Sequence, residues 1–314
     1  TGIDGSAKPE RRIFPRRSGF AIEGRKPGCQ AVRSMNSIKS VGIIGLGIIG
    51  AQVAAALRAA GCEVPVWNRT RKEMPGFRSS PAEVAQAAEV IQLFVADPKA
   101  VYEVLEAMDS ALTERHTIIC SATLGREATL EAARRVAARG AKFLDAPFTG
   151  SKEAAGKSQL LYYIGGDDAV LEAVRPVLEV SGGKGIVKIA AIGDAAVIKV
   201  VTNVLSAATV EVLAEMVAVV KKAGIAPEML EKALEKHGIR SGIIDMKLPK
   251  MIAEDYDTHF ALKHMLKDVR FGLDLGAELK LDLPVTSTTE AVMSQCAARG
   301  WGDLDFSTVY QRFA

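Results

Sequence analysis

The chain has 314 residues, of which 48% are hydrophobic and 25% charged, and its formal net charge at pH 7 is +3. This length predicts about two domains of roughly 150 residues each, and the composition excludes a disordered protein. No run approaches the roughly 20 apolar residues that a membrane-spanning helix needs, so we expect no membrane partner.

The cysteines and histidines argue against two kinds of site. The four cysteines are far apart and form no CxxC pair: Cys29, Cys62, Cys120 and Cys296. This spacing disfavours a disulfide framework and structural zinc, and it fits a reducing cytosol. No group of His, Cys and Asp has ligand spacing, so we expect a cytoplasmic protein without a bound metal.

Residues 1–34 differ in charge from the rest of the chain. They carry eight Lys or Arg and three Asp or Glu, a net charge of +5, which leaves −2 for residues 35–314. They show no hydrophobic period, and Ile22 to Arg25 spells a protease recognition sequence that expression vectors use. We therefore interpret residues 1–34 as a disordered or vector-derived tail, and expect no nucleic-acid partner for the acidic remainder.

The first predicted elements are a strand, a glycine turn, a helix and a second strand, at residues 41–44, 45–50, 51–60 and 63–67. The turn reads Gly45-Leu46-Gly47-Ile48-Ile49-Gly50, the GxGxxG spacing of a dinucleotide-binding fold. In that motif the glycines make the turn, admit the pyrophosphate and let the helix approach the strand. We expect this turn to bind a dinucleotide phosphate at the helix N-terminus. The alternative is a glycine turn without a ligand.

The end of the second strand bears on which dinucleotide is bound. An NAD site usually places a carboxylate there, but this chain has Asn68, Arg69 and Thr70 and no acid before Glu73. A guanidinium can pair with a 2′-phosphate through two parallel hydrogen bonds. We therefore predict NADP(H) in preference to NAD(H), with Arg69 as the main discriminator. The alternative is a solvated basic turn.

The next elements alternate between strands and helices. Strand patterns occur at residues 90–95, 117–120, 142–144, 160–164 and 186–189, and helix patterns at 97–108, 126–139 and 167–180. Residues 73–80 contain Pro75 and Gly76, so we expect an abbreviated connection there. This alternation predicts an α/β fold, a doubly wound Rossmann parallel sheet that occupies residues 36–193.

The pattern changes after Gly193. Residues 194–223 contain no Gly or Pro and predict one helix of about 45 Å. Further helix patterns follow at residues 227–237, 241–253, 259–276 and 284–299. We therefore expect an all-α C-terminal domain at residues 194–314, joined to the sheet by the long interdomain helix.

One lysine stands out in the long helix. Lys199 is the only charged residue in residues 195–210, and Asn203 lies one turn later on the same face. A buried, unpaired ammonium is costly, so this pattern favours a site that uses the charge, such as one for a carbonyl or anionic substrate. The alternative is a lysine whose side chain extends to water.

A second candidate segment follows a predicted strand. Thr149, Gly150 and Ser151 offer hydroxyl and backbone N–H groups that suit a small carboxylate, at a strand's carboxyl end where α/β folds bind ligands. The alternative is an ordinary turn between a strand and a helix.

These motifs together resemble the β-hydroxyacid dehydrogenase family, also called 3-hydroxyisobutyrate dehydrogenase-like. The resemblance is carried by the glycine turn, DAPFTGS at 145–151, Gly193…Lys199…Asn203 and Lys267-Asp268. VWNRT at 66–70 and GDLDFS at 302–307 look most like the glyoxylate/succinic semialdehyde reductase branch.

The resemblance implies a role for each matching residue. Lys199 would be the catalytic acid, and Asn203 would hold Lys199 and the substrate. Thr149, Gly150 and Ser151 would bind the substrate carboxylate, with Ser121 near the nicotinamide. Phe260, Lys267 and Asp268 would close over the cofactor. The family often has threonine where this chain has Ala122, and Thr123 would substitute for it.

The function that this implies is NADPH-dependent reduction of a small carboxylate-bearing aldehyde or keto acid, of the glyoxylate or succinic semialdehyde type, to the hydroxy acid. One alternative is a 3-hydroxyisobutyrate-like dehydrogenase. Another is an imine reductase, which the presence of Lys199 disfavours. A third is a catalytically inactive chromatin or nucleic-acid scaffold. We expect a homodimer or homotetramer, because a long apolar helix usually needs a partner surface.

Overall fold

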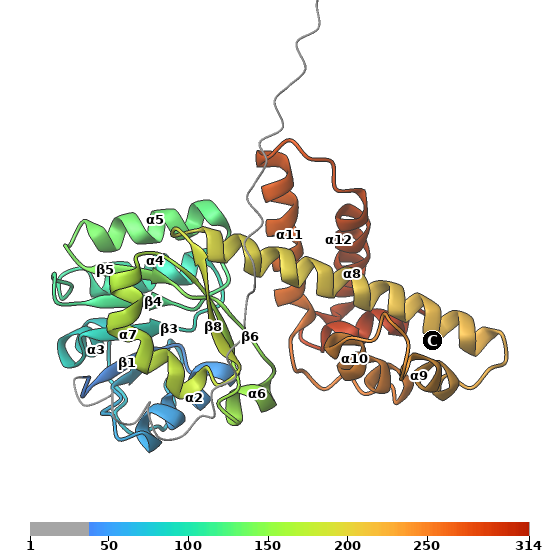
Figure 1. Cartoon of the computed structure of the whole chain (residues 1–314), viewed down its shortest axis with the longest axis horizontal. Coiled ribbons are helices and arrows are strands. Elements are labelled where there is room, and N and C mark those ends of the chain that lie inside the picture. The colour runs from blue at the N-terminus through green and yellow to red at the C-terminus, as the bar shows by residue number, and fades with distance from the viewer. Residues whose placement is uncertain (1–37, 314) are drawn as a thin grey trace, which may run out of the picture.

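The computed structural model describes residues 38–313, so the tail expected at residues 1–34 lies outside the described part of the chain. Figure 1 shows an α/β region and a helical region, with the helix α8 (Asp194–Lys222) running from the first into the second. The class predicted from the sequence, an α/β fold followed by helices, is confirmed.

The sheet has eight strands in the order β2-β1-β3-β4-β5-β7-β6, with β8 paired to β7. Their bounds are β1 Val41–Ile44, β2 Val66–Trp67, β3 Val90–Leu93, β4 Thr117–Cys120, β5 Lys142–Asp145, β6 Phe148–Thr149, β7 Leu161–Gly165 and β8 Gly185–Ala190. Strands β1 to β5 are mutually parallel, as predicted.

One edge of the sheet departs from the prediction of a wholly parallel sheet. Strand β7 pairs antiparallel with both β5 and β6, while β8 is parallel to β7. The short helix α6 (Lys152–Gly156) spans only five residues and provides no full crossover between β5 and β7. The 15 residues between Asp145 and Leu161 include β6, which pairs antiparallel with β7, so no helical crossover brings β7 back parallel to β5.

Helices cover both faces of the sheet, which is the doubly wound arrangement. One buried apolar cluster joins α2 (Ile48–Ala59) and α7 (Asp168–Ser181) to the sheet. The other joins α3 (Pro81–Ala87), α4 (Pro98–Met108) and α5 (Arg126–Ala137). The connection at residues 73–80 contains no helix, and the sequence analysis missed the seven-residue α3 that follows it.

The second region is helical. Its elements after α8 are α9 Glu228–Leu234, α10 Gly242–Ile252, α11 Leu262–Glu278, α12 Pro284–Cys296, η2 Ala297–Trp301 and η3 Phe306–Phe313. One apolar cluster packs the C-terminal half of α8 against these helices. Among the described residues, α8 alone is long and apolar enough to cross a membrane by length and composition, a test that the core helix of a soluble protein also passes.

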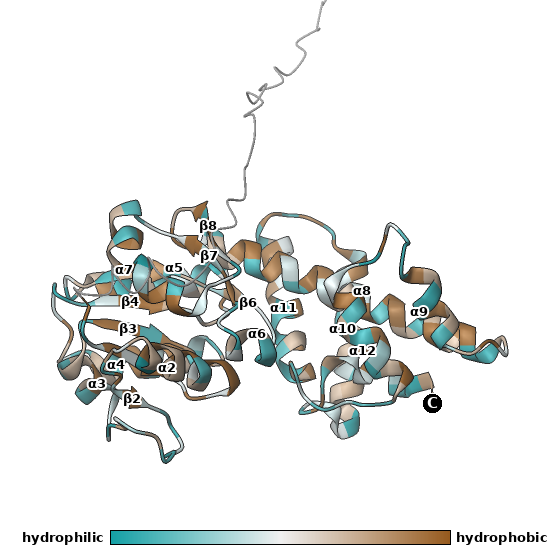
Figure 2. Cartoon of the chain, turned by 60° about the horizontal axis from the view of Figure 1, so that its bottom comes forward, coloured by the Kyte–Doolittle hydropathy of each residue, from teal (hydrophilic) through white to brown (hydrophobic). Residues whose placement is uncertain are grey.

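Helix α8 keeps an apolar face toward solvent. Figure 2 shows hydrophobic residues along much of its length. Five of them recur at helical spacing and are more than two-fifths exposed: Val201, Leu205, Val212, Met216 and Val219.

Candidate active site

The glycine turn lies between β1 and α2. Gly45 has a φ of +98°, and a Cβ there would lie 2.3 Å from the carbonyl oxygen of Phe94, so only glycine fits. Gly47 is the N-cap of α2, with no side-chain cap on the helix, and a Cβ at Gly47 would meet nothing within 4 Å. The turn therefore leaves the N–H groups at the start of α2, from Ile48 and Ile49 onward, open to an anionic ligand. These features fit a dinucleotide pyrophosphate.

The loop after β2 is bonded to this turn. Asn68 Oδ1 accepts the backbone N–H of Leu46 at 2.9 Å, and Asn68 Nδ2 donates to the carbonyl of Thr70 at 2.7 Å. Lys72 Nζ donates to the carbonyl of Leu46 at 2.6 Å, a contact that the sequence analysis missed. Arg69 and Thr70 are exposed, and Arg69 forms no ion pair with any described residue. The basic loop is thus fixed beside the glycine turn with its guanidinium facing solvent.

Lys199 is buried, with 8% of the residue exposed. Its Nζ donates to Asn203 Oδ1 at 2.9 Å. Burial lowers the pKa of Lys199 to about 8, although the nearby carboxylate of Asp268 acts in the opposite direction. A lysine with such a pKa exchanges its proton near neutral pH, which suits general acid–base chemistry.

A chain of hydrogen bonds continues from Lys199 to the α/β region. Asn203 Nδ2 donates to Asp268 Oδ2 at 2.6 Å. Lys267 Nζ donates to Asp268 Oδ1 at 2.7 Å and to the carbonyl of Thr123 at 2.9 Å. The structure therefore brings together five residues that the sequence analysis selected separately, from α8, α11 and the loop after β4. It attaches the buried Asp268 to Asn203 and Lys267, whereas the resemblance implied a contact with the cofactor.

Ser121 follows β4 and lies inside a buried polar network. Its hydroxyl accepts Gln92 Nε2 at 2.9 Å, and the same Nε2 donates to the Tyr162 hydroxyl at 3.3 Å. The Tyr162 hydroxyl in turn contacts that of Ser181 at 2.9 Å. These partners of Ser121 were not predicted from the sequence. Ala122 beside it is buried.

The predicted carboxylate-binding segment is an edge strand followed by a helix cap. Thr149 of β6 pairs with Leu161 of β7, and Gly150 is exposed. Ser151 Oγ accepts the N–H of Ala154 at the start of α6. No hydrogen bond joins residues 149–151 to Lys199 within the described chain. Their role stays a prediction.

Phe260 is held by a buried ion pair that the sequence analysis did not find. Lys247 and Asp305 are 1% and 0% exposed, and their charged groups are 2.7 Å apart. Asp305 Oδ2 also accepts the backbone N–H groups of His259 at 3.0 Å and Phe260 at 3.1 Å. The GDLDFS segment therefore fixes the chain just before α11, the helix that carries Lys267 and Asp268.

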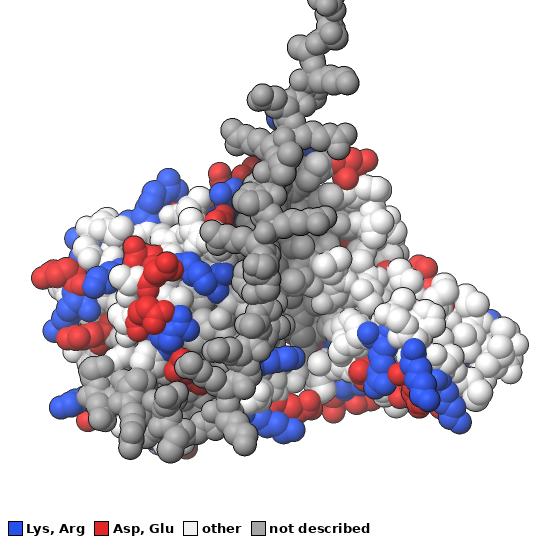
Figure 3. All heavy atoms as spheres, viewed as in Figure 1, with Lys and Arg blue, Asp and Glu red and all other residues white. Residues whose placement is uncertain are grey.

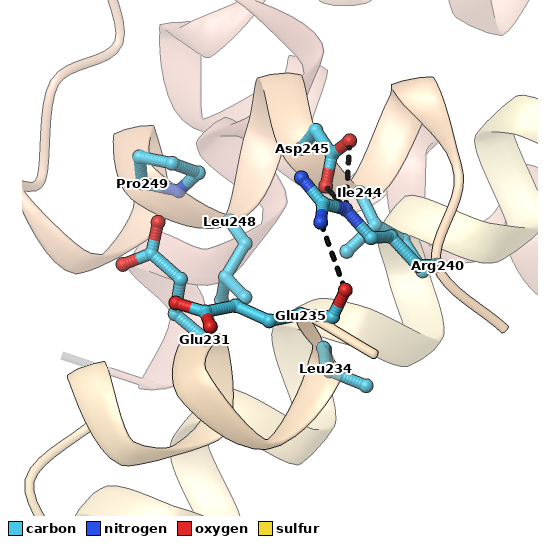
Figure 4. A pocket seen from close by; sticks show the side chains of 8 residues that line it. All are labelled: Glu231, Leu234, Glu235, Arg240, Ile244, Asp245, Leu248 and Pro249. Carbon is cyan, nitrogen blue, oxygen red and sulfur yellow. Dashed lines mark hydrogen bonds and ion pairs between the residues drawn. The ribbon is translucent and has the colours of Figure 1, made fainter. Parts of the chain in front are cut away.

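Two other surface features lie apart from these residues. Figure 4 shows a hollow between α9 and α10, near the C-terminal half of α8, where Arg240 binds Asp245 and the carbonyl of Glu235. On the face seen in Figure 3, Lys and Arg are interspersed with Asp and Glu over the α/β region. Among residues 38–313, no group of three His, Cys, Asp or Glu is placed to hold a metal ion.

Two family models together match almost the whole described chain. The model for the NAD binding domain of 6-phosphogluconate dehydrogenase matches residues 40–193. The model for the NAD-binding domain of NADP-dependent 3-hydroxyisobutyrate dehydrogenase matches residues 193–313.

Similar proteins include reductases and dehydrogenases. The chain is 29% identical over 282 residues to glyoxylate/succinic semialdehyde reductase 2, chloroplastic, of Arabidopsis thaliana, covering 87% of this chain and 78% of that protein. It is 30% identical over 280 residues to 2-hydroxy-3-oxopropionate reductase of Escherichia coli (strain K12), covering 86% and 96%. The solved structure of 3-hydroxyisobutyrate dehydrogenase from Mycobacterium tuberculosis, with L-serine, matches with 25% identity and a TM-score of 0.79, covering 88% and 99%.

Proposed function

Because the chain belongs to the β-hydroxyacid dehydrogenase family of NAD(P)-dependent oxidoreductases, we propose that it reduces a small carboxylate-bearing aldehyde or keto acid with NADPH. The observation that carries this proposal is the buried ammonium of Lys199, bonded to Asn203 and linked through Asp268 and Lys267 to the loop after β4. Both selected relatives at 29–30% identity are reductases by name, which supports this direction of reaction.

The mechanism assigns one proton to Lys199. The glycine turn and Arg69 would hold NADPH, whose nicotinamide would supply the hydride. As negative charge develops on the carbonyl oxygen of the substrate, the Lys199 ammonium stabilises that charge and donates a proton to the oxygen. Asn203 Oδ1 fixes the position of Lys199 Nζ by accepting its hydrogen bond. Asp268 fixes the Asn203 side chain by accepting a hydrogen bond from Asn203 Nδ2. Thr149, Gly150 and Ser151 bind the substrate carboxylate, which orients the carbonyl group.

The cofactor preference rests on Arg69. Its exposed guanidinium lies on the loop that Asn68 and Lys72 fasten to the glycine turn, beside which the cofactor's adenosine ribose is expected. Arg69→Ala is expected to lower the preference for NADPH over NADH about 10-fold or more, as for the loss of a charge-assisted contact. Arg71→Ala is the matched control, because Arg71 stacks over the Phe77 ring at 5.7 Å. An unchanged preference in Arg69→Ala contradicts the assignment.

The substrate is tested by NADPH oxidation with glyoxylate, succinic semialdehyde and longer oxo acids. Turnover of at least one of these supports the proposal. The 3-hydroxyisobutyrate-like alternative predicts that oxidation of a 3-hydroxy acid is favoured. Turnover of cyclic imines without turnover of any aldehyde favours the imine reductase. Salt-sensitive DNA binding that survives deletion of residues 1–34, with no turnover, favours the scaffold.

The exposed apolar face of α8 supports a homodimer or homotetramer. Leu205 and Val212 are 64% and 54% exposed on this face. Burying such a stripe against a second copy removes apolar surface from water. Light scattering after gel filtration is expected to give an oligomer for the wild type and smaller species for Leu205→Glu.

A further inference from the structure

Helix α8 begins without a capping side chain of its own. Its N-cap residue is Gly193, whose φ of +92° favours glycine, and glycine has no side chain to accept a hydrogen bond. An N-cap side chain normally accepts the N–H of the second or third helical residue, which here are Ala195 and Ala196. The start of α8 therefore needs an acceptor from elsewhere in the chain.

A carboxylate from β5 provides this acceptor. Asp145 Oδ2 accepts the N–H of Ala196 at 3.1 Å and the N–H of Gly193 at 3.0 Å. Asp145 is almost fully buried and ends β5, 51 residues before Ala196. It thus performs the role of an N-cap for a helix that begins far away in the sequence.

The surroundings of Asp145 are built for this contact. Gly165 of β7 pairs with Asp145, and a Cβ at Gly165 would lie 3.1 Å from Asp145 Oδ2 and 2.4 Å from the carbonyl oxygen of Ala191. A larger residue there would push the carboxylate away from the helix. Burial raises the pKa of Asp145 to about 7, while the two N–H groups act to lower it. The hydrogen bonds to the start of α8 therefore offset part of the desolvation penalty of burying this carboxyl group.

The contact joins two parts of the proposed active site. Asp145 is the first residue of the DAPFTGS segment, which leads to the predicted carboxylate-binding residues 149–151. Lys199 lies three residues after Ala196, which is less than one turn and about 4.5 Å along the helix axis. A tilt or fraying of the first turn of α8 would therefore move Lys199 Nζ relative to the substrate.

We propose that Asp145 is a positioning residue, which sets Lys199 against the substrate-binding segment by capping α8 from the end of β5. This proposal rests on the proposed function of Lys199. Asp145 itself donates no proton to the substrate.

Two substitutions of Asp145 distinguish its hydrogen bonds to the start of α8 from its negative charge. Asp145→Asn keeps an oxygen that can accept both N–H groups, and is expected to keep kcat within about threefold of the wild type. Asp145→Leu has a similar size but no acceptor. It is expected to lower kcat about 10- to 100-fold, the range for a misplaced catalytic group, with little change in the KM for NADPH. Asp145→Ala removes the acceptor without adding bulk and repeats the test if the leucine variant does not fold.

Asp167→Leu is the matched control. Asp167 caps α7 by accepting the N–H groups of Ala169 at 2.7 Å and Val170 at 3.3 Å, so it also bonds two backbone N–H groups. Its loss is expected to lower the melting temperature but to leave kcat unchanged. A loss of kcat in Asp167→Leu as large as that in Asp145→Leu would mean that general destabilisation explains both, and would overturn the proposal.

A second readout does not depend on turnover. The Lys199 ammonium can be titrated by NMR in the cofactor-free protein with labelled lysine. Asp145→Asn is expected to leave its pKa near 8, while Asp145→Leu is expected to raise the pKa toward 10.5 because a loosened first turn admits water. An unchanged titration and kcat in Asp145→Leu would overturn the proposal. If the wild type reduces no carbonyl substrate, the proposed function fails, and the titration alone decides whether Asp145 positions Lys199.

Discussion

Replacing Lys199 with methionine is expected to stabilise the cofactor-free protein at neutral pH while abolishing most of its turnover. Methionine has a similar length and no charge, so it removes the cost of burying an ammonium. Lowering a lysine pKa from 10.5 to about 8 corresponds to about 3.5 kcal/mol against the charged form, at about 1.4 kcal/mol for each pKa unit. The lost hydrogen bond to Asn203 offsets about 1 kcal/mol of this gain.

The sign of the pH dependence follows from the direction of the pKa change. Lys199 binds its proton more weakly in the folded protein than in the unfolded chain. The penalty is therefore complete below about pH 8, fades between pH 8 and 10.5, and is absent above that range. Lys199→Met is expected to gain about 2.5 kcal/mol at pH 7 and to lose that gain near pH 10.5.

Urea unfolding of the cofactor-free wild type and variant at both pH values measures this difference. Lys99→Met is the control, because the Lys99 side chain is 86% exposed and its loss is expected to change stability little. A variant that is no more stable than the wild type at pH 7, or that keeps the same gain at pH 10.5, would show that burial does not destabilise the charged form of Lys199.

Two further predictions concern pH and a structural ion pair. With Lys199 as the acid, kcat for carbonyl reduction is expected to fall as pH rises through about 8, because the ammonium loses its proton. The kcat for alcohol oxidation is expected to rise over the same range, because the neutral amine then acts as the base. Profiles of kcat against pH that are flat from pH 6 to 10 would contradict this role. Lys247→Met leaves the fully buried Asp305 without its ion-pair partner and is expected to lower the free energy of unfolding in urea by about 3–5 kcal/mol. The control Lys263→Met removes an exposed pair with Asp303 and is expected to lower it by less than about 1 kcal/mol. Equal losses would show that burial of the Lys247 pair has no energetic role.

The sequence predicted α8 well because its apolar pattern is local and continuous. The expected end at residue 223 lies one residue beyond the observed Lys222. The direction of β7 could not be predicted in the same way. Its antiparallel pairing goes with a connection through β6 and the five-residue α6 in place of a crossover helix, and the position of these two elements beside the sheet is set by tertiary packing.

Two buried lysines, Lys199 and Lys247, show how much of the site the sequence pattern predicts. Lys199 is the only charged residue in residues 195–210, whereas Lys247 lies two residues after Asp245 and three before Lys250, so the pattern that selected Lys199 gave no reason to select Lys247. Only the fold shows that both are buried and how their partners differ: Lys247 pairs directly with Asp305, while Lys199 reaches Asp268 through Asn203. The carboxylates involved are 58 or more residues away in the sequence, and a single sequence gives no signal for such a pairing.

Asp145 illustrates the same limit. The sequence predicted that residues 145–151 follow a strand and that Thr149, Gly150 and Ser151 in this segment bind a carboxylate. It predicted no separate role for Asp145. Its contact with Ala196 depends on how α8 meets the end of β5, which no local pattern encodes. The glycine at position 193 was a possible signal, since a helix that starts on glycine lacks a side-chain cap.

The role of Lys199 is tested most directly by comparing the turnover and NADPH binding of Lys199→Ala with those of the wild type. We expect a loss of about 10²- to 10⁴-fold in kcat for reduction, with NADPH affinity close to that of the wild type. A variant that binds NADPH and turns over at a nearly normal rate would contradict the assignment of Lys199 as the proton donor.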